Sequence, residues 1–216
     1  MKSVREAMKL YAITNCKEVR KNDLLATTEA ALKNGITCLQ LREKNLNEEE
    51  FLAEALKLKK LCNDYGVPFI INDNVDIAVK SNADGVHVGQ EDLEAGKARQ
   101  IIGNGKLLGV SAQTVEDALK AQEAGADYIG VGSMFPTGTK LDASTISIRD
   151  LKEICSAVKI PVVAIGGINE DNVLELSGSG IDGISVVSAI YGAADAGKAT
   201  KNLLELSEKM LNHYPN

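Results

Sequence analysis

Short apolar runs and segments of helical length alternate along the whole chain of 216 residues. The apolar runs, such as "YIGVG" and "PVVAI", are almost continuous, as in strands that are buried on both faces. Buried strands that alternate with helices are typical of a parallel sheet covered by helices. Because the pattern repeats about eight times, we expect an α/β fold in which the sheet closes into a (β/α)8 TIM barrel.

The limits of the expected elements follow from the apolar runs and from capping signals. Asn47 and Thr114 are placed as the N-caps of two helices, and Gly35 as the residue that stops another. The expected strands are 9–14, 37–43, 68–72, 84–88, 106–111, 127–132, 161–167 and 182–188. The expected helices are 22–34, 48–65, 75–80, 93–102, 114–124, 147–158, a segment from about 171, and 195–212.

The main alternative fold is an open, doubly wound sheet. Such sheets often carry a Gly-x-Gly-x-x-Gly turn after the first strand, and no such motif follows residues 9–14. No linker or low-complexity stretch divides the chain. We therefore predict a single barrel domain over residues 1–216.

Charge and cysteine content exclude several classes of protein. The net charge of −6 gives no reason to expect binding to nucleic acid or to an anionic membrane. No apolar run is long enough to span a bilayer, and the first residues lack the apolar stretch of a signal peptide. The four cysteines, Cys16, Cys38, Cys62 and Cys155, include no Cys-x-x-Cys pair, and only two histidines are present. We expect free thiols, a cytoplasmic protein and no zinc site.

Polar residues gather at one end of the expected strands. The active sites of such barrels lie at the carboxyl ends of the strands, so polar residues there are candidates for function. In chain order they are Gln40, Arg42, Lys44, Asn72, Asp73, His87, Gln90, Asp92, Ser111, Gln113, Thr137, Thr139, Lys140, Gly166, Gly167 and Ser188.

The charged members of this set suit a metal ion and a polyphosphate. Mg²⁺ commonly takes one or two carboxylates and completes its shell with water and substrate phosphate, which fits Asp73 and Asp92. Arg42, Lys44 and Lys140 would neutralise the remaining phosphate charge. We therefore infer a metal-assisted anion pocket near the second to fifth strands.

A second, metal-free anion pocket is expected near the sixth to eighth strands. The glycine turn at 166–167 and the loop after the last strand occupy the usual phosphate site of this fold. The hydroxyl groups of Thr137 and Thr139 follow the sixth strand and could face the same anion.

Each of these features also has a purely structural interpretation. Arg42 and Lys44 could form a solvated rim, and Asp73 and Asp92 could cap the helices that follow them. His87 lies within an apolar run, which is more typical of a hydrogen-bonded core histidine than of a catalyst. The functional interpretation is favoured because all these positions fall on one rim of the predicted barrel.

Seven blocks of the sequence carry a resemblance to a known family. They are "LQLREK" (39–44), "INDNVDIA" (71–78), "ADGVHVGQEDL" (83–93), "GVSAQT" (109–114), "GVGSMFPTGTK" (130–140), "VVAIGGI" (162–168) and "VVSAI" (186–190). Together, in this order and spacing, they resemble thiamine-phosphate synthases (thiamine-phosphate pyrophosphorylases). The resemblance implies a transferase of thiamine biosynthesis with Mg²⁺ as cofactor. It would join 4-amino-2-methyl-5-hydroxymethylpyrimidine diphosphate to a thiazole phosphate and release pyrophosphate.

The same resemblance implies roles for individual residues. The pyrimidine diphosphate would be bound by Gln40, Arg42, Lys44, Asn72, Ser111 and Lys140. Of these, Arg42, Lys44, Ser111 and Lys140 would also serve catalysis. Mg²⁺ would be held by Asp73 and Asp92. The thiazole phosphate would be bound by Thr137, Thr139, Gly167, Val187 and Ser188. The resemblance further implies a dissociative substitution through a pyrimidine cation, and it leaves a homo-oligomer possible.

Three rival functions stay open from the sequence. A thiazole tautomerase would resemble this barrel, but that family uses a histidine where this chain has Gln113 and tends to lose the metal and diphosphate residues. A non-catalytic phosphate-binding barrel would not need the carboxylate pair Asp73 and Asp92. A sugar-phosphate epimerase or decarboxylase would need an acid/base cluster inside the barrel mouth, and no such cluster is evident.

Overall fold

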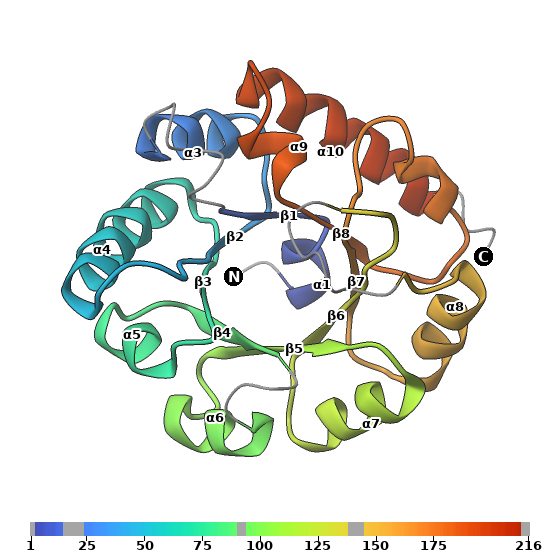
Figure 1. The fold of residues 1–216 in the computed structure, drawn as a ribbon, viewed down its shortest axis with the longest axis horizontal. Helices are drawn as coiled ribbons and strands as arrows, with labels where there is room; N and C mark the ends of the chain where they lie inside the picture. Colours follow the sequence, from blue (N-terminus) through green and yellow to red (C-terminus); the bar gives the residue numbers. More distant parts are fainter. Residues whose placement is uncertain (1–2, 15–23, 90–93, 138–144, 213–216) are drawn as a thin grey trace.

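A closed barrel of parallel strands forms the centre of the protein. The computed structural model describes residues 3–14, 24–89, 94–137 and 145–212. Within these residues the strands follow one another around the barrel in chain order and close between the last and the first (Figure 1). They are β1 (Leu10–Ile13), β2 (Cys38–Leu41), β3 (Phe69–Asn72), β4 (Gly85–Val88), β5 (Leu107–Ala112), β6 (Tyr128–Val131), β7 (Val162–Ile165) and β8 (Gly183–Val186). The predicted fold class is therefore confirmed.

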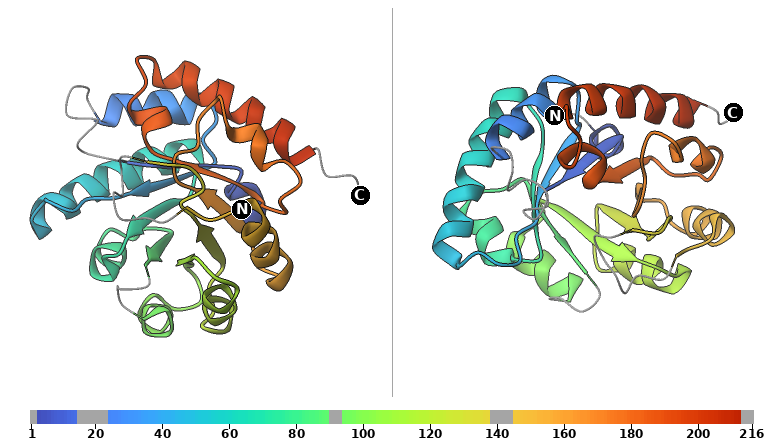
Figure 2. Two further views of the ribbon diagram at one scale, coloured as in Figure 1. Left: turned by 45° about the vertical axis from the view of Figure 1, so that its right-hand side comes forward. Right: turned by 45° about the horizontal axis from the view of Figure 1, so that its top comes forward.

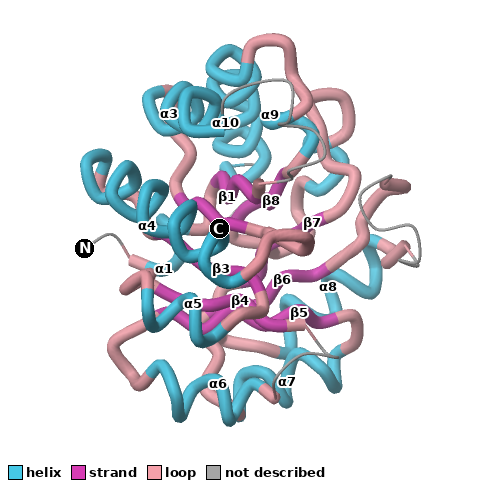
Figure 3. The backbone as a smooth tube through the Cα atoms, turned by 60° about the vertical axis from the view of Figure 1, so that its left-hand side comes forward, coloured by secondary structure: helices cyan, strands magenta, loops and turns pink. Residues whose placement is uncertain are grey.

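Helices surround the barrel on the outside (Figures 1 and 3). They are α3 (Leu24–Lys33), α4 (Glu48–Tyr65), α5 (Val75–Lys80), α6 (Ala95–Ile102), α7 (Val115–Glu123), α8 (Ile148–Ala157) and α10 (Ala196–Asn212), with shorter turns at η1 (Val173–Leu176) and α9 (Ser188–Tyr191). In Figure 2 the long α10 lies beside α3, so the last and one of the first helices of the chain pack against each other. No helix in the described part is long and apolar enough to cross a membrane.

Two separate sets of buried side chains follow from the alternation along each strand. Residues such as Leu10, Leu39 and Ile71 point outward and pack under the helices. The other set fills the barrel interior and includes Tyr11, Ile13, Cys38, Ile70, Tyr128 and Val163. The short helix α1 (Val4–Ala7) packs its last turn against this interior set and covers the amino-terminal end of the barrel (Figure 1).

The predicted helix starts agree with the structure. Asn47 and Thr114 each accept a hydrogen bond from the backbone N–H three residues on, at the start of α4 and α7. In both helices the third residue returns a hydrogen bond, which completes a capping box. At α5 the cap is Asn74, so the proposal that Asp73 caps this helix is wrong.

Four parts of the chain differ from the prediction. The helix expected from about residue 171 is only the 3₁₀ turn η1, because the glycine-serine segment 177–180 follows and Gly178 and Gly180 take positive φ angles of 70° and 93°. Helices α1 and α9 were not expected. Strand β2 ends at Leu41, so Arg42 and Lys44 lie in the loop that follows.

The cysteines agree with the prediction of free thiols. Cys38, Cys62 and Cys155 form no disulfide, and Cys16 lies outside the described residues. Burial raises the pKa of Cys62 and of Cys155 to about 12, so neither thiol is a reactive thiolate near neutral pH.

Candidate active site

The rim at the carboxyl ends of the strands holds the candidate site. Ten of the predicted site residues are described there: Gln40, Arg42, Lys44, Asn72, Asp73, Ser111, Thr137, Gly167, Val187 and Ser188. The other three, Asp92, Thr139 and Lys140, lie outside the described residues, and so does Gln90. The predicted roles of all thirteen stay predictions.

Lys44 and Asn72 both contact the carboxylate of Asp73. The Lys44 ammonium forms an ion pair with Oδ2 of Asp73, although the two residues follow different strands. Nδ2 of Asn72 donates a hydrogen bond of 2.8 Å to Oδ1 of the same carboxylate. The side chain of Asp73 is 22% exposed and that of Lys44 is 49% exposed, so the group is open to a ligand from the rim.

The backbone holds Asp73 in an uncommon conformation. Its φ angle is 61°, in the left-handed region that non-glycine residues seldom adopt. Its N–H donates to the carbonyl oxygen of His87 at 2.8 Å, which ties the end of β3 to β4. This conformation turns the carboxylate toward Lys44 at the point where β3 ends, and such strained residues are common at functional sites.

Arg42 is anchored through its backbone. Its N–H donates to Oγ1 of Thr14 at 2.9 Å, and Thr14 is fully buried at the end of β1. The Arg42 side chain is half-buried. Arg42 lies in the same loop as Lys44, after β2. The two positive charges that are predicted to face a diphosphate therefore belong to one short segment.

Glu43 stands between these two cations and is only 9% exposed. Burial and, to a smaller extent, the nearby charge of Glu54 together raise the pKa of the Glu43 carboxyl to about 7. The burial of this acid was not expected, because in the "LREK" segment Glu43 has the pattern of one more exposed charge.

A hydrogen-bonded chain crosses the barrel interior beneath the rim and connects two predicted site residues, Gln40 and Ser111. Nε2 of Gln40 donates to Oη of Tyr11 at 2.7 Å, and the hydroxyl groups of Tyr11 and Tyr128 lie 2.8 Å apart. Oη of Tyr128 lies 3.2 Å from Nδ1 of His87, and Nε2 of His87 lies 3.1 Å from Oγ of Ser111. His87 is thus hydrogen-bonded through both ring nitrogens, as predicted for a core histidine, but one of its partners belongs to the candidate site.

The two tyrosines were not expected to matter for the site. Tyr11 and Tyr128 lie within apolar strands, and both are almost completely buried. Burial raises the pKa of both phenols well above the usual value, so they stay protonated and act as neutral hydrogen-bonding groups. The period of two along each strand could have placed them inside the barrel, but it could not have paired them with His87.

The loops after β6 and β7 are held together at the second predicted pocket. Backbone N–H groups of Met134 and Phe135 donate to the carbonyl oxygens of Ile165 and Gly166 at 2.9 and 3.0 Å. Gly167 has a φ angle of 67°, and a Cβ atom there would lie 2.6 Å from the carbonyl oxygen of Pro136. A glycine is therefore required at this turn, and its backbone lies directly against the segment that leads into Thr137.

Val187 and Ser188 complete this side of the rim. Val187 is half-buried at the end of β8 and packs on the interior set of side chains. Ser188 is exposed and begins α9, whose first turn returns the N–H groups of Ile190 and Tyr191 to the carbonyl oxygen of Val187. The backbone thus turns sharply at the position where the fold places its phosphate site.

The donor chemistry at Asp73 fits a hard divalent cation. Its carboxylate is an oxygen donor that already faces a cation, the Lys44 ammonium. Among the described residues no group of three or more His, Cys, Asp or Glu side chains could hold a metal. Mg²⁺ needs no such cluster, because one or two carboxylates with water and substrate phosphate are sufficient.

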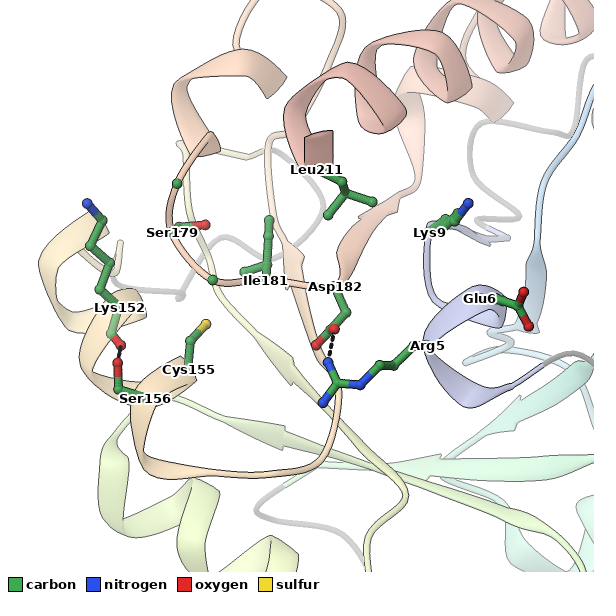
Figure 4. Close-up of a pocket in the computed structure, with 12 residues that line it drawn as sticks. Arg5, Glu6, Lys9, Lys152, Cys155, Ser156, Ser179, Ile181, Asp182 and Leu211 are labelled. Carbon is green, nitrogen blue, oxygen red and sulfur yellow. Dashed lines mark hydrogen bonds and ion pairs between the residues drawn. The ribbon is translucent and has the colours of Figure 1, made fainter. Parts of the chain in front are cut away.

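A separate groove lies at the opposite end of the barrel (Figure 4). Its volume is about 750 Å³, and it is bordered by the segment before β8, by α8 and by the residues around α1. Arg5 and Asp182 form an ion pair within it, as Figure 4 shows. Both charges of this pair are satisfied by each other, and the groove is remote from the rim where chemistry occurs in this fold.

Known proteins resemble this chain in sequence and in fold. A family described as thiamine monophosphate synthase matches residues 10–190. A thiamine-phosphate synthase of Clostridium tetani is 53% identical over 194 residues, which cover 90% of this chain and 93% of that protein. One of Methanobrevibacter smithii is 50% identical over 198 residues, covering 92% and 94%. A solved thiamine phosphate pyrophosphorylase from Pyrococcus furiosus superposes with a TM-score of 0.89 at 41% identity, over 97% of this chain and all of that one.

Proposed function

The chain belongs to the thiamine monophosphate synthase family, and from this premise we propose how its rim residues carry out the reaction. It is an enzyme, a transferase of thiamine biosynthesis. The proposed reaction joins 4-amino-2-methyl-5-hydroxymethylpyrimidine diphosphate to a thiazole phosphate, with thiamine phosphate and pyrophosphate as products. The observation that carries the proposal is the contact of Lys44 and Asn72 with the carboxylate of Asp73, because it gathers groups suited to a diphosphate and its metal ion.

The pyrimidine diphosphate is proposed to bind between β2 and β5. Arg42, Lys44 and Lys140 neutralise the negative charge that grows on the diphosphate as the bond from carbon to oxygen breaks. Gln40, Asn72 and Ser111 orient the substrate through hydrogen bonds. These three side chains come from three different strands, so they contact the substrate from several sides and hold it still.

Asp73 and Asp92 would hold Mg²⁺. When bound, this ion would neutralise diphosphate charge and make pyrophosphate a better leaving group. Because the Asp73 carboxylate forms an ion pair with Lys44 in this structure, it could hold a metal ion only if that contact opened, and the Lys44 ammonium would then be available to the diphosphate.

The thiazole phosphate is proposed to bind between β6 and β8. Thr137, Thr139 and Ser188 offer hydroxyl donors, and the turns at Gly167 and Val187 offer backbone N–H groups. This proposal is supported by the contact of the β6 loop with the β7 turn, because the segment that leads into Thr137 lies against Gly167 there.

The attacking atom is a neutral thiazole nitrogen, which carries no proton to be removed. No general base is therefore required. Positive charge develops on the pyrimidine ring as pyrophosphate leaves, and the ring's own amino group stabilises it. The residues of this chain therefore contribute by stabilising the leaving group and by holding both substrates face to face.

The names of the relatives favour the synthase over the thiazole tautomerase and over a non-catalytic phosphate-binding barrel. Gln113 agrees with this choice, because it stands where the tautomerases use a histidine. Its Nε2 donates to the carbonyl oxygen of Gly132 at 3.4 Å, so in this structure the side chain contacts the β6 loop.

We further propose that the enzyme works in the cytoplasm, as its substrates are charged metabolites.

Replacement of a proposed metal ligand tests this assignment. Asp92→Ala should remove Mg²⁺-dependent release of pyrophosphate while the protein stays folded, as judged by circular dichroism and thermal unfolding. Asp64→Ala, at an exposed position on α4, is the matched control and should keep full activity. Undiminished metal-dependent turnover by Asp92→Ala would remove Asp92 from the metal site.

A further inference from the structure

In the hydrogen-bonded chain of the barrel interior, the donor is fixed at one end, at Gln40. The amide nitrogen of Gln40 can only donate, so Oη of Tyr11 accepts at 2.7 Å. In the first of two possible directions, Tyr11 donates its own proton to Tyr128, whose hydroxyl oxygen lies 2.8 Å away. Tyr128 in turn donates to Nδ1 of His87. Each group thus accepts from one neighbour and donates to the next.

The opposite direction would leave Tyr11 poorly satisfied. It would then accept hydrogen bonds from both Gln40 and Tyr128, and its own proton would have only the nearby sulfur of Cys38, a weak acceptor. In a buried site a poorly satisfied hydroxyl group is costly, so the first direction is favoured.

We propose that His87 is a positioning residue that is held as the neutral Nε2–H tautomer and directs the hydroxyl proton of Ser111 toward the pyrimidine diphosphate. With Nδ1 accepting from Tyr128, the ring proton is on Nε2, which lies 3.1 Å from Oγ of Ser111. Ser111 then accepts from His87 and donates its own proton to an acceptor atom of the substrate. If the ring proton were on Nδ1, Ser111 would donate its hydroxyl proton to Nε2 of His87 and could only accept a hydrogen bond from the substrate.

The glycines of the neighbouring strands support this arrangement. A Cβ atom on Gly109 would lie 2.3 Å from Oη of Tyr128 and 2.4 Å from Nδ1 of His87. Any side chain at position 109 would therefore occupy the place of this hydrogen bond. A Cβ atom on Gly130 would lie 3.2 Å from Cε1 of His87 on its other side. The barrel thus has room for these two rings in this geometry because both facing positions lack side chains.

The inference rests on the proposed role of Ser111 in binding the pyrimidine diphosphate, but its first test needs no substrate. Long-range ¹H–¹⁵N correlation spectra of the histidine-labelled protein report the tautomer of each ring. The chain has only two histidines, and a His213→Gln variant assigns the signals. We expect His87 to be a neutral Nε2–H ring in the wild-type protein. A Nδ1–H ring, an even mixture of tautomers or an imidazolium would overturn the inference.

Tyr128→Phe supplies the second test, because it removes the donor to Nδ1 and leaves the ring in place. We expect His87 to lose its single tautomer and kcat to fall about 3- to 10-fold, the worth of one hydrogen bond, with KM for the thiazole phosphate unchanged. Tyr191→Phe is the matched control, since it also removes a buried tyrosine hydroxyl, one that bonds Thr28 at 3.1 Å outside the barrel. It should leave the His87 signals and kcat unchanged.

Two results separate this inference from the proposed function. Unchanged kinetic constants in a folded Tyr128→Phe protein would overturn the role of His87, even if Ser111→Ala were inactive. Full activity of Ser111→Ala would instead contradict the proposed role of Ser111, and the inference about its orientation would fall with it.

Discussion

The ammonium group of Lys44 forms an ion pair with the carboxylate of Asp73, across the loops that follow β2 and β3. In the proposed reaction these two residues have different partners: Lys44 faces the diphosphate and Asp73 faces the metal ion. Binding of both proposed partners would therefore require this ion pair to open.

Removal of Lys44 should strengthen metal binding to the substrate-free protein. The Lys44 ammonium competes with a divalent cation for Oδ2 of Asp73, and its positive charge also repels that cation. Lys44→Met should therefore bind Mn²⁺ about two- to fivefold more tightly, which corresponds to the usual contribution of a half-exposed ion pair. Electron paramagnetic resonance of free and bound Mn²⁺ measures this affinity. Lys120→Met, which breaks an exposed pair with Glu116 on α7, is the control and should not change it. Weaker Mn²⁺ binding by Lys44→Met would contradict the competition.

A side chain at position 109 should destabilise the barrel. In Gly109→Ala the new Cβ would lie 2.2 Å from Cζ of Tyr128, so both rings must shift, and the free energy of unfolding should fall by about 1–3 kcal/mol. Urea denaturation measures the loss. Gly96→Ala is the control, because nothing lies within 4 Å of a Cβ there and the residue is in α6, so no loss is expected. Equal stability of the two variants would show that the interior is looser than described.

The buried acid Glu43 should make stability depend on pH. Its carboxyl keeps its proton up to about pH 7 in the folded protein but loses it near 4.5 when unfolded. The contribution of the neutral group to stability is therefore complete below pH 4.5 and is lost as the pH rises to 7. Glu43→Gln cannot ionise, so relative to the wild type it should gain about 1–3 kcal/mol between pH 4.5 and pH 8.

Urea denaturation at both pH values measures this difference. Glu123→Gln, at an exposed position at the end of α7, is the control and should follow the wild-type curve. A Glu43→Gln curve parallel to that of the wild type from pH 4.5 to 8 would mean that Glu43 ionises as an ordinary exposed acid.

The sequence predicted the barrel because its strands are buried on both faces and therefore appear as continuous apolar runs. The position of the rim followed from the fold, since parallel strands all end at the same edge. This was sufficient to predict that Asn72, Asp73 and Lys44 lie on the same rim, where Lys44 and Asn72 contact the carboxylate of Asp73. The short helix α1 was missed because four residues leave too weak a periodic signal.

The interior hydrogen bonds could not be predicted in the same way. Tyr11 and Tyr128 read as apolar strand residues, and their pairing depends on which strands face each other across the closed barrel. The space for the tyrosine and histidine rings depends on Gly109 and Gly130. In the sequence, a glycine within a strand indicates only that the strand is locally less stable. Contacts across a barrel are set by its closure, a property that no single segment of sequence contains.

The most direct test of the proposed function is the release of pyrophosphate by the purified protein. The pyrimidine diphosphate, the thiazole phosphate and Mg²⁺ are mixed with the enzyme, with each substrate omitted in turn and with EDTA as the metal control. We expect steady release only when both substrates and the metal ion are present, together with equal amounts of thiamine phosphate. No release under these conditions by a folded protein that still binds the thiazole phosphate would contradict the proposed reaction.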